Sequence, residues 1–312
     1  MRRVSIIVIA LLAVLVVLQV AAMAIPDRLT ALGLSAERRF GGLTVRAAQV
    51  EGFTMPYLEG GQGEPLLLIH GFGGDKDNFT RIARHLTPHY RVLIPDLPGF
   101  GDSAPRKMDG SYRMADQVRR LHALLGQLGI KRIHLGGNSM GGFIAAQFAA
   151  THPDMVASVW LLDPSGTAVS HDTALLREYA RTGENPLLAR QVGDVDNMIA
   201  STMHQPPYFP GFVRDTLGRR AVADLALHRR ILQQVHGSPL LEASYKSIAA
   251  PALIVWGDRD QILNPAGAAS FQALFPRSQV VMMKEIGHLP MIEAPAQTAA
   301  DYLRFRAGLS AR

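Results

Sequence analysis

A serine flanked by glycines is the first candidate for chemistry. The run Gly137-Asn138-Ser139-Met140-Gly141 follows the apolar stretch 132–136 and precedes a stretch of small residues at 141–150. A G-x-S-x-G sequence between a strand and a helix is typical of a nucleophile elbow, a tight turn that lifts a serine hydroxyl above a sheet. We therefore predict that Ser139 is a nucleophile, the alternative being an ordinary loop serine.

A serine nucleophile needs a base, and the chain has 11 histidines. In folds with such an elbow the catalytic residues follow the order serine, acid, histidine along the chain. Only His288 follows both Ser139 and an acid at the end of an apolar run, so we predict that it is the base. His85 and His89 are the one pair with H-x-x-x-H spacing, but both are expected to be surface or packing residues. The predictions therefore include no metal site and no cofactor.

The acid must orient the histidine and stabilise its cation. Asp260 is preferred because it lies deep in the loop after the apolar run 252–257, where it can turn back under the sheet. Asp258 is expected to cap that turn. Asp163, at the end of the apolar run 156–163, is the alternative acid, because some serine hydrolases take the acid from the end of that strand. Asp96 is expected to shape a loop.

An oxyanion hole is predicted from two backbone N–H groups. One belongs to Phe72, in the glycine-rich turn after the apolar run 65–70, and the other to Met140, beside the nucleophile. The start of the predicted helix at 141–150 adds a partial positive charge there. His70 is expected to bond the loop backbone, with a direct catalytic role as the alternative.

Short apolar runs without polar alternation suggest the elements that position these residues. Such runs suit parallel strands covered on both faces, and helical patterns separate them, so we predict a doubly wound, mostly parallel α/β sheet. The segments 43–50 and 53–59 are expected to add an antiparallel pair at one edge. The predicted strands lie at 65–70, 91–96, 132–136, 156–163, 252–257 and 279–284, and the clearest helices at 114–128, 141–150 and 265–275.

The stretch between Asp163 and Pro251 has helical patterning and no clear strand. We predict a helical lid inserted into the core, with apolar side chains that could line a pocket for an acyl chain. The predicted organisation is an N-terminal membrane anchor or signal peptide at 1–26, a juxtamembrane connector at 27–42, a core at 43–165 and 249–312, and the lid at 166–248.

The first segment is apolar from Val4 to Ile25 and follows Arg2 and Arg3. As a helix it would be roughly 33 Å long, enough to cross a bilayer core. The two arginines should stay in the cytoplasm, which places the catalytic part outside it, on the periplasmic side in a Gram-negative bacterium. A single-pass anchor is preferred over a signal peptide because the run is long.

The alternative of cleavage rests on the small residues in Ala22-Met23-Ala24. Pro26 is expected to end the membrane helix, and 28–40 is either an amphipathic helix in the headgroup region or a solvated connector. Small residues in the apolar segment would allow two helices to pair, so a homodimer is one expectation. These residues are Ala10, Ala13, Ala21 and Ala22.

Composition narrows the function classes. Hydrophobic residues make up 48% and charged residues 19%, which excludes a disordered or fibrous chain. The absence of cysteine excludes disulfides, thiol nucleophiles and cysteine-ligated metals. The net charge of +6 comes from scattered basic residues, so no nucleic-acid partner is predicted, and anionic membrane phospholipid fits the charge better.

Together these motifs make the chain resemble the α/β-hydrolase superfamily from about residue 40 to its end. Within it the chain resembles the membrane-anchored monoacylglycerol lipases and related bacterial lipases and phospholipases A, on the run 70–79 and the apolar first segment. The superfamily pattern of glycine, two residues and aspartate falls on Asp260. The resemblance implies a carboxylic ester hydrolase that cleaves acylglycerols or glycerophospholipids with a Ser-His-Asp triad.

Three alternatives stay open on the sequence. The carbon–carbon bond hydrolases of aromatic degradation share the Gly-Asn-Ser-Met-Gly-Gly elbow, but they are cytoplasmic, and the segment 4–25 argues against them. An esterase for soluble esters and a non-catalytic receptor are the others. Haloalkane dehalogenases and epoxide hydrolases carry aspartate at the elbow, and Ser139 argues against both.

Overall fold

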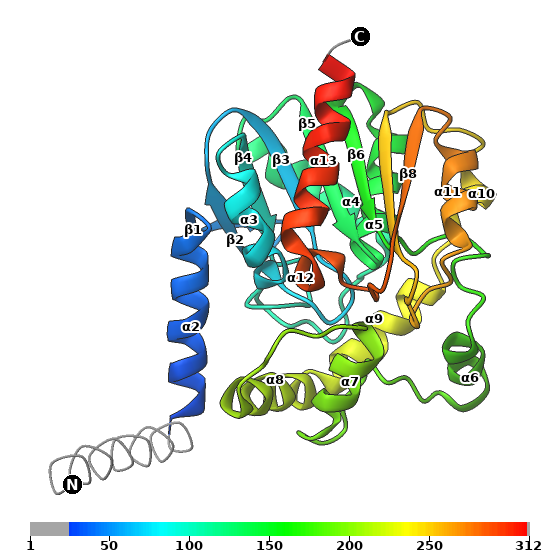
Figure 1. The fold of residues 1–312 in the computed structure, drawn as a ribbon. Helices are drawn as coiled ribbons and strands as arrows, with labels where there is room; N and C mark the ends of the chain where they lie inside the picture. The colour runs from blue at the N-terminus through cyan, green and yellow to red at the C-terminus, as the bar shows by residue number, and fades with distance from the viewer. Residues whose placement is uncertain (1–24, 311–312) are drawn as a thin grey trace, which may run out of the picture.

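A computed structural model of the protein describes residues 25–310 and contains one eight-stranded sheet in the order β1-β2-β4-β3-β5-β6-β7-β8 (Figure 1). The strands β1 and β2 pair antiparallel, as do β2 and β4, and the other neighbours are parallel. The predicted mostly parallel sheet with an antiparallel edge pair is therefore confirmed. The strands are β1 (Leu43–Val50), β2 (Phe53–Gly60), β3 (Glu64–Ile69), β4 (Tyr90–Pro95), β5 (Ile133–Asn138), β6 (Val156–Leu162), β7 (Ala252–Gly257) and β8 (Ser278–Met283).

The central strands are mostly apolar because helices cover both faces of the sheet. Every residue of β5 and β7 is buried, whereas the edge strand β8 is only partly covered. On one face Trp160 of β6 stacks on Tyr302 of α13, with ring centroids 4.3 Å apart. Helices α3 (Thr80–Leu86), α12 (Pro290–Glu293) and α13 (Pro295–Ser310) cover this face, and α4 (Met114–Gln127), α5 (Met140–Thr151) and α11 (Gly267–Leu274) cover the other. The 3-10 helices η1 (Lys76–Phe79) and η2 (Pro153–Met155) complete the core.

Helices alone follow β6 until β7 begins, as the sequence pattern predicts. Figure 1 shows α7, α8 and α9 gathered below one end of the sheet, away from the C-terminal helix tip. The five helices are α6 (Ala174–Thr182), α7 (Asp194–Thr202), α8 (Gly211–Ala223), α9 (Leu225–His236) and α10 (Leu241–Ser244).

The segment before the core is a helix, α2 (Pro26–Phe40). Pro26 begins this helix, at a position where its missing N–H is not needed. The helix is held at both ends, because Asp27 pairs with Arg219 of α8 and the Arg38 guanidinium donates to Asp77 of η1 at 2.6 Å. The prediction that Pro26 ends a helix refers to the apolar segment before it, which the structure does not describe.

That apolar segment, 1–24, lies outside the described residues. From residue 25 to 310, no helix has the length and apolar character needed to span a bilayer. The predicted anchor and the predicted pairing of its alanines remain predictions.

Candidate active site

Ser139 occupies a strained turn between β5 and α5. Its φ and ψ are 56° and −119°, a left-handed conformation that few non-glycine residues adopt. The turn depends on its two flanking glycines. A Cβ on Gly137 would lie 2.2 Å from the carbonyl oxygen of Gly141, and a Cβ on Gly141 would lie 2.1 Å from that of Ile69. This is the geometry of the predicted nucleophile elbow.

His288 and Asp260 meet in the interior, as predicted. The Nδ1 atom of His288 lies 2.8 Å from Oδ2 of Asp260, and the two side chains are 4% and 0% exposed. Oδ2 also accepts the indole N–H of Trp256 at 3.0 Å, and Oδ1 accepts the backbone N–H groups of Ile262 and Leu263 at 2.8 and 3.0 Å. Four donors therefore hold the Asp260 carboxylate in place. The carboxylate in turn orients the His288 ring, whose Nε2 stays free to bond another group.

Ser139 and His288 share one cavity. Ser139 and His288 both line a cavity of about 600 Å³, and the Asn138 side chain ties the two loops together by donating to the carbonyl oxygen of His288 at 2.9 Å. In residues 25–310 no hydrogen bond joins the Ser139 hydroxyl to His288. In free enzymes this contact is often long and tightens only when substrate binds.

The two predicted oxyanion donors come from two segments beside Ser139. Phe72 lines the cavity, and Met140 is the first residue of α5, whose opening N–H groups have no partner within the helix. Neither N–H group is paired with an acceptor within the described part of the chain. Both are available to a developing oxyanion.

The neighbouring polar residues have structural contacts. Burial lowers the pKa of His70, so the ring is neutral, donates from Nδ1 to the carbonyl oxygen of Gly71 at 2.8 Å and accepts the N–H of Leu97 at Nε2. Asp96 shapes its loop by accepting the backbone N–H of Lys76 at 2.8 Å. Asp258 differs from the expectation of a turn cap, since its Oδ1 accepts the N–H of Glu285 at 2.7 Å and so joins two loops.

The alternative acid, Asp163, lies beside the preferred one. Its carboxylate, that of Asp260 and the His288 ring each offer one atom, and the three atoms lie within 4.8 Å of one another. This is the only group of acidic, histidine and cysteine side chains between residues 25 and 310 that is close enough to hold a metal ion. Asp260 already accepts four hydrogen bonds, so the arrangement suits the orientation of the His288 ring better than the binding of a cation.

Helices outside the core wall the cavity. Apolar side chains come from the helices and loops between β6 and β7, and α2 adds residues that the sequence did not connect with the site. The spacing of the leucines along 28–40 indicates an amphipathic helix, but it does not indicate which surface of the protein these leucines face. The walls include Leu187, Met198, Ile199, Phe209 and Leu217 after β6, and Leu29, Gly33 and Leu34 on α2.

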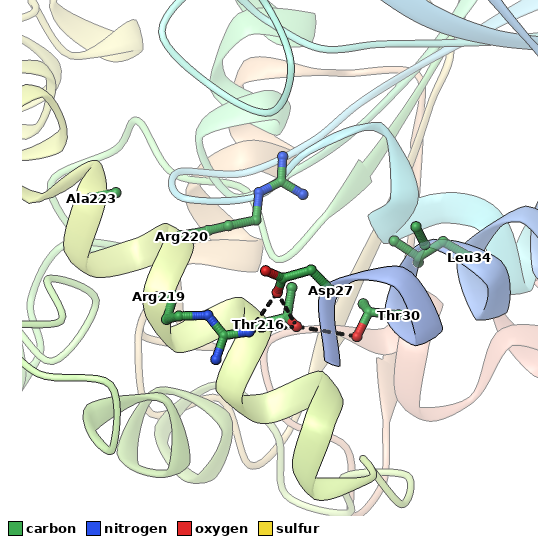
Figure 2. A pocket seen from close by; sticks show the side chains of 8 residues that line it. Asp27, Thr30, Leu34, Thr216, Arg219, Arg220 and Ala223 are labelled. Atoms are coloured by element: carbon green, nitrogen blue, oxygen red, sulfur yellow. Dashed lines mark hydrogen bonds and ion pairs between the residues drawn. The ribbon is translucent and has the colours of Figure 1, made fainter. Parts of the chain in front are cut away.

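A second cavity of about 410 Å³ lies between α2 and α8 (Figure 2). The Thr216 hydroxyl donates to Asp27 at 2.7 Å and accepts from Thr30, and Arg219 completes this chain of contacts. Thr30 and Thr216 line both cavities, so the seam between the two helices borders the site.

A model of the alpha/beta hydrolase fold family matches residues 64–295. The chain belongs to this family. The resemblance predicted from the elbow, acid and histidine motifs is thus confirmed, and so is the predicted α/β-hydrolase fold.

Relatives of this hydrolase include lipases. Lipase 1 of Psychrobacter immobilis is 42% identical over 285 residues, which are 88% of each chain. The monoacylglycerol lipase abhd6-B of Xenopus laevis is 26% identical over 276 residues, covering 84% of this chain and 82% of the relative. The crystal structure of a membrane phospholipase A superposes with a TM-score of 0.89 at 39% identity, over 99% of both chains.

Proposed function

We propose that this α/β hydrolase cleaves carboxylic esters of lipids, acylglycerols or glycerophospholipids, at a membrane surface through Ser139, His288 and Asp260. The observation that carries the proposal is an elbow serine and an aspartate-oriented histidine opening into one largely apolar cavity of about 600 Å³. The prediction of a carboxylic ester hydrolase is confirmed as an enzyme class by the lipase at 42% identity and the phospholipase A structure.

The mechanism is acyl transfer in two steps. Nε2 of His288 takes the proton of the Ser139 hydroxyl as the oxygen attacks the ester carbonyl, and the N–H groups of Phe72 and Met140 bind the oxyanion. The imidazolium then gives its proton to the leaving alcohol. Water repeats the cycle on the acyl-enzyme and releases the fatty acid, while Asp260 stays ionised and stabilises the cation.

The nucleophile is tested by Ser139→Ala. Hydrolysis of a short p-nitrophenyl ester should fall about ten-thousand-fold or more, and labelling by a fluorophosphonate should vanish. Ser111→Ala, at an exposed serine on the loop before α4, is the matched control and should keep both. Wild-type hydrolysis by Ser139→Ala would refute the proposal.

The lipid substrate follows from the cavity walls. We propose that α7 and α8 act as a lid whose apolar side chains hold an acyl chain above Ser139. A panel of monoacylglycerol, phospholipid, a soluble ester and a soluble diketo acid, with the products identified, tests this. Turnover confined to the soluble compounds would exclude a lipase and favour an esterase or a carbon–carbon bond hydrolase.

The proposed role of the membrane surface rests on α2, which lines the cavity and directly follows the apolar segment. An anchor would hold the cavity near concentrated acyl esters and raise their effective concentration. Removing residues 1–24, which leaves α2 complete, should lower hydrolysis of bilayer phospholipid more than that of a soluble ester. Equal losses on both substrates would count against the surface role.

A further inference from the structure

A second carboxyl group lies against the catalytic pair, and the mechanism above does not use it. Asp163 follows β6 directly, has a positive φ of 44° and is fully buried. Its Oδ1 accepts the backbone N–H of Gly257, at the end of β7, at 2.8 Å. Its Oδ2 is buried, and no donor within the described residues reaches it.

An acceptor without a donor, next to a carboxylate, is explained by a proton. Two carboxylates this close cannot both be ionised, because their charges repel in a medium of low polarity. Asp260 accepts four hydrogen bonds and Asp163 one, so the negative charge belongs on Asp260 and the proton on Asp163.

The surrounding charges agree with this assignment. Burial, and then the charge of Asp260, raises the pKa of Asp163 well above its usual range, with a further contribution from Glu293. The imidazole of His288 is the third titratable group of this cluster, and its Nδ1–H points to Asp260. Glu293 is engaged with the backbone N–H groups of Gly287 and His204.

We propose that Asp163 is a positioning residue and the reserve acid of the triad: protonated, it supports Asp260 by a hydrogen bond, and without Asp260 it ionises and orients His288 itself. The inference rests on the proposed Ser139 chemistry. In the reserve state the Asp163 proton leaves to solvent, the carboxylate accepts the Nδ1–H of His288, and the imidazole again takes the Ser139 proton.

The test is a double-mutant cycle on the full-length protein with the short p-nitrophenyl ester. A triad that loses its only acid loses about ten-thousand-fold in kcat. We expect Asp260→Asn to keep about 1 to 10% of wild-type kcat, and Asp163→Asn, which keeps a donor beside Asp260, to stay within about threefold. The double variant should lose about ten-thousand-fold.

A pH profile separates this role from simple packing. In Asp260→Asn, activity requires ionised Asp163, so the acid limb of kcat/KM should move at least about one unit above that of wild type. Asp301→Asn is the matched control, another buried carboxyl, which lies on α13 and does not line the cavity; added to Asp260→Asn it should leave this limb in place. Asp260→Ala, which leaves Asp163 room to approach His288, is the second variant if Asp260→Asn does not fold.

The outcomes are distinct. Loss of activity in Asp260→Asn or Asp260→Ala as deep as in the double variant, in protein with a cooperative thermal transition, would overturn the reserve role. So would an unshifted acid limb. Activity retained in Ser139→Ala would instead refute the proposed function.

Discussion

The ammonium nitrogen of Lys76 lies 2.9 Å from Oδ2 of Asp96, and the two side chains are 2% and 0% exposed. The same nitrogen lies 2.6 Å from Asp102, which also accepts a hydrogen bond from Arg220 of α8. Lys76 follows the loop of Phe72, so this buried network joins that loop, the loop after β4 and α8, a helix that lines the cavity.

Replacing Lys76 by methionine should lower the free energy of unfolding by about 3–5 kcal/mol, because Asp96 would remain as a buried charge without its partner. Urea denaturation at pH 7 measures this. Arg91→Met breaks the half-exposed pair with Glu59 and should change stability by less than about 1 kcal/mol. A similar small change in both variants would show that Asp96 does not depend on Lys76.

The seam between α2 and α8 predicts a local effect. Thr216→Val removes the buried hydroxyl that contacts both Asp27 and Thr30, which should lower stability by about 1 kcal/mol. The measurement is limited proteolysis, in which α2 should be cleaved faster than in wild type. Thr182→Val, at the end of α6, is the control, and equal cleavage rates in the two variants would contradict a role for the seam.

The elbow glycine is predicted to tolerate no side chain. Gly141→Ala should abolish ester hydrolysis or destabilise the fold by several kcal/mol, since its Cβ would meet the backbone oxygen of Ile69. Gly126→Ala is the matched control on the exposed face of α4, where a Cβ meets nothing within 4 Å. There the change should stabilise by up to about 1 kcal/mol. Thermal unfolding and esterase rates of both variants check this.

Acid should destabilise the fold through buried neutral histidines. Burial lowers the pKa of His134 and of His228 to about 4. Because the folded pKa lies below the unfolded value near 6.5, this stability is complete above about pH 6.5 and is lost as pH falls toward 4, by up to about 3 kcal/mol per histidine.

The variant His228→Phe tests this, because it keeps an aromatic ring between Phe72 and Phe100 without a titrating group. The decrease in urea midpoint from pH 7 to pH 5 should be smaller than in wild type. His89→Phe, at an exposed histidine, should leave the wild-type slope unchanged. The same slope in all three proteins would contradict the prediction.

The sequence located the candidate site because each motif follows a parallel strand, and such strand ends meet at one edge of a sheet. Ser139 follows β5, Asp260 lies three residues past β7, and His288 lies five residues past β8. The relation of Asp163 to Asp260 could not be predicted, since it depends on the register of β6 against β7 and on donors such as the Trp256 indole.

Pro26 shows a second limit of prediction from sequence patterns, since a proline alone does not indicate which helix it belongs to. A proline ends one helix or begins another with equal ease, and only the contacts of Asp27 and Arg38 determine that 26–40 packs as α2. The sequence therefore did not predict that α2 lines the cavity.

That wall matters for anyone who prepares a shortened enzyme. Leu29, Gly33 and Leu34 close one side of the space above Ser139. A chain trimmed to the start of β1 would keep Ser139, Asp260 and His288 but should open the cavity to water along that side. Trimming at residue 25 keeps the side closed, so the choice of first residue would set substrate preference as directly as a substitution in the pocket.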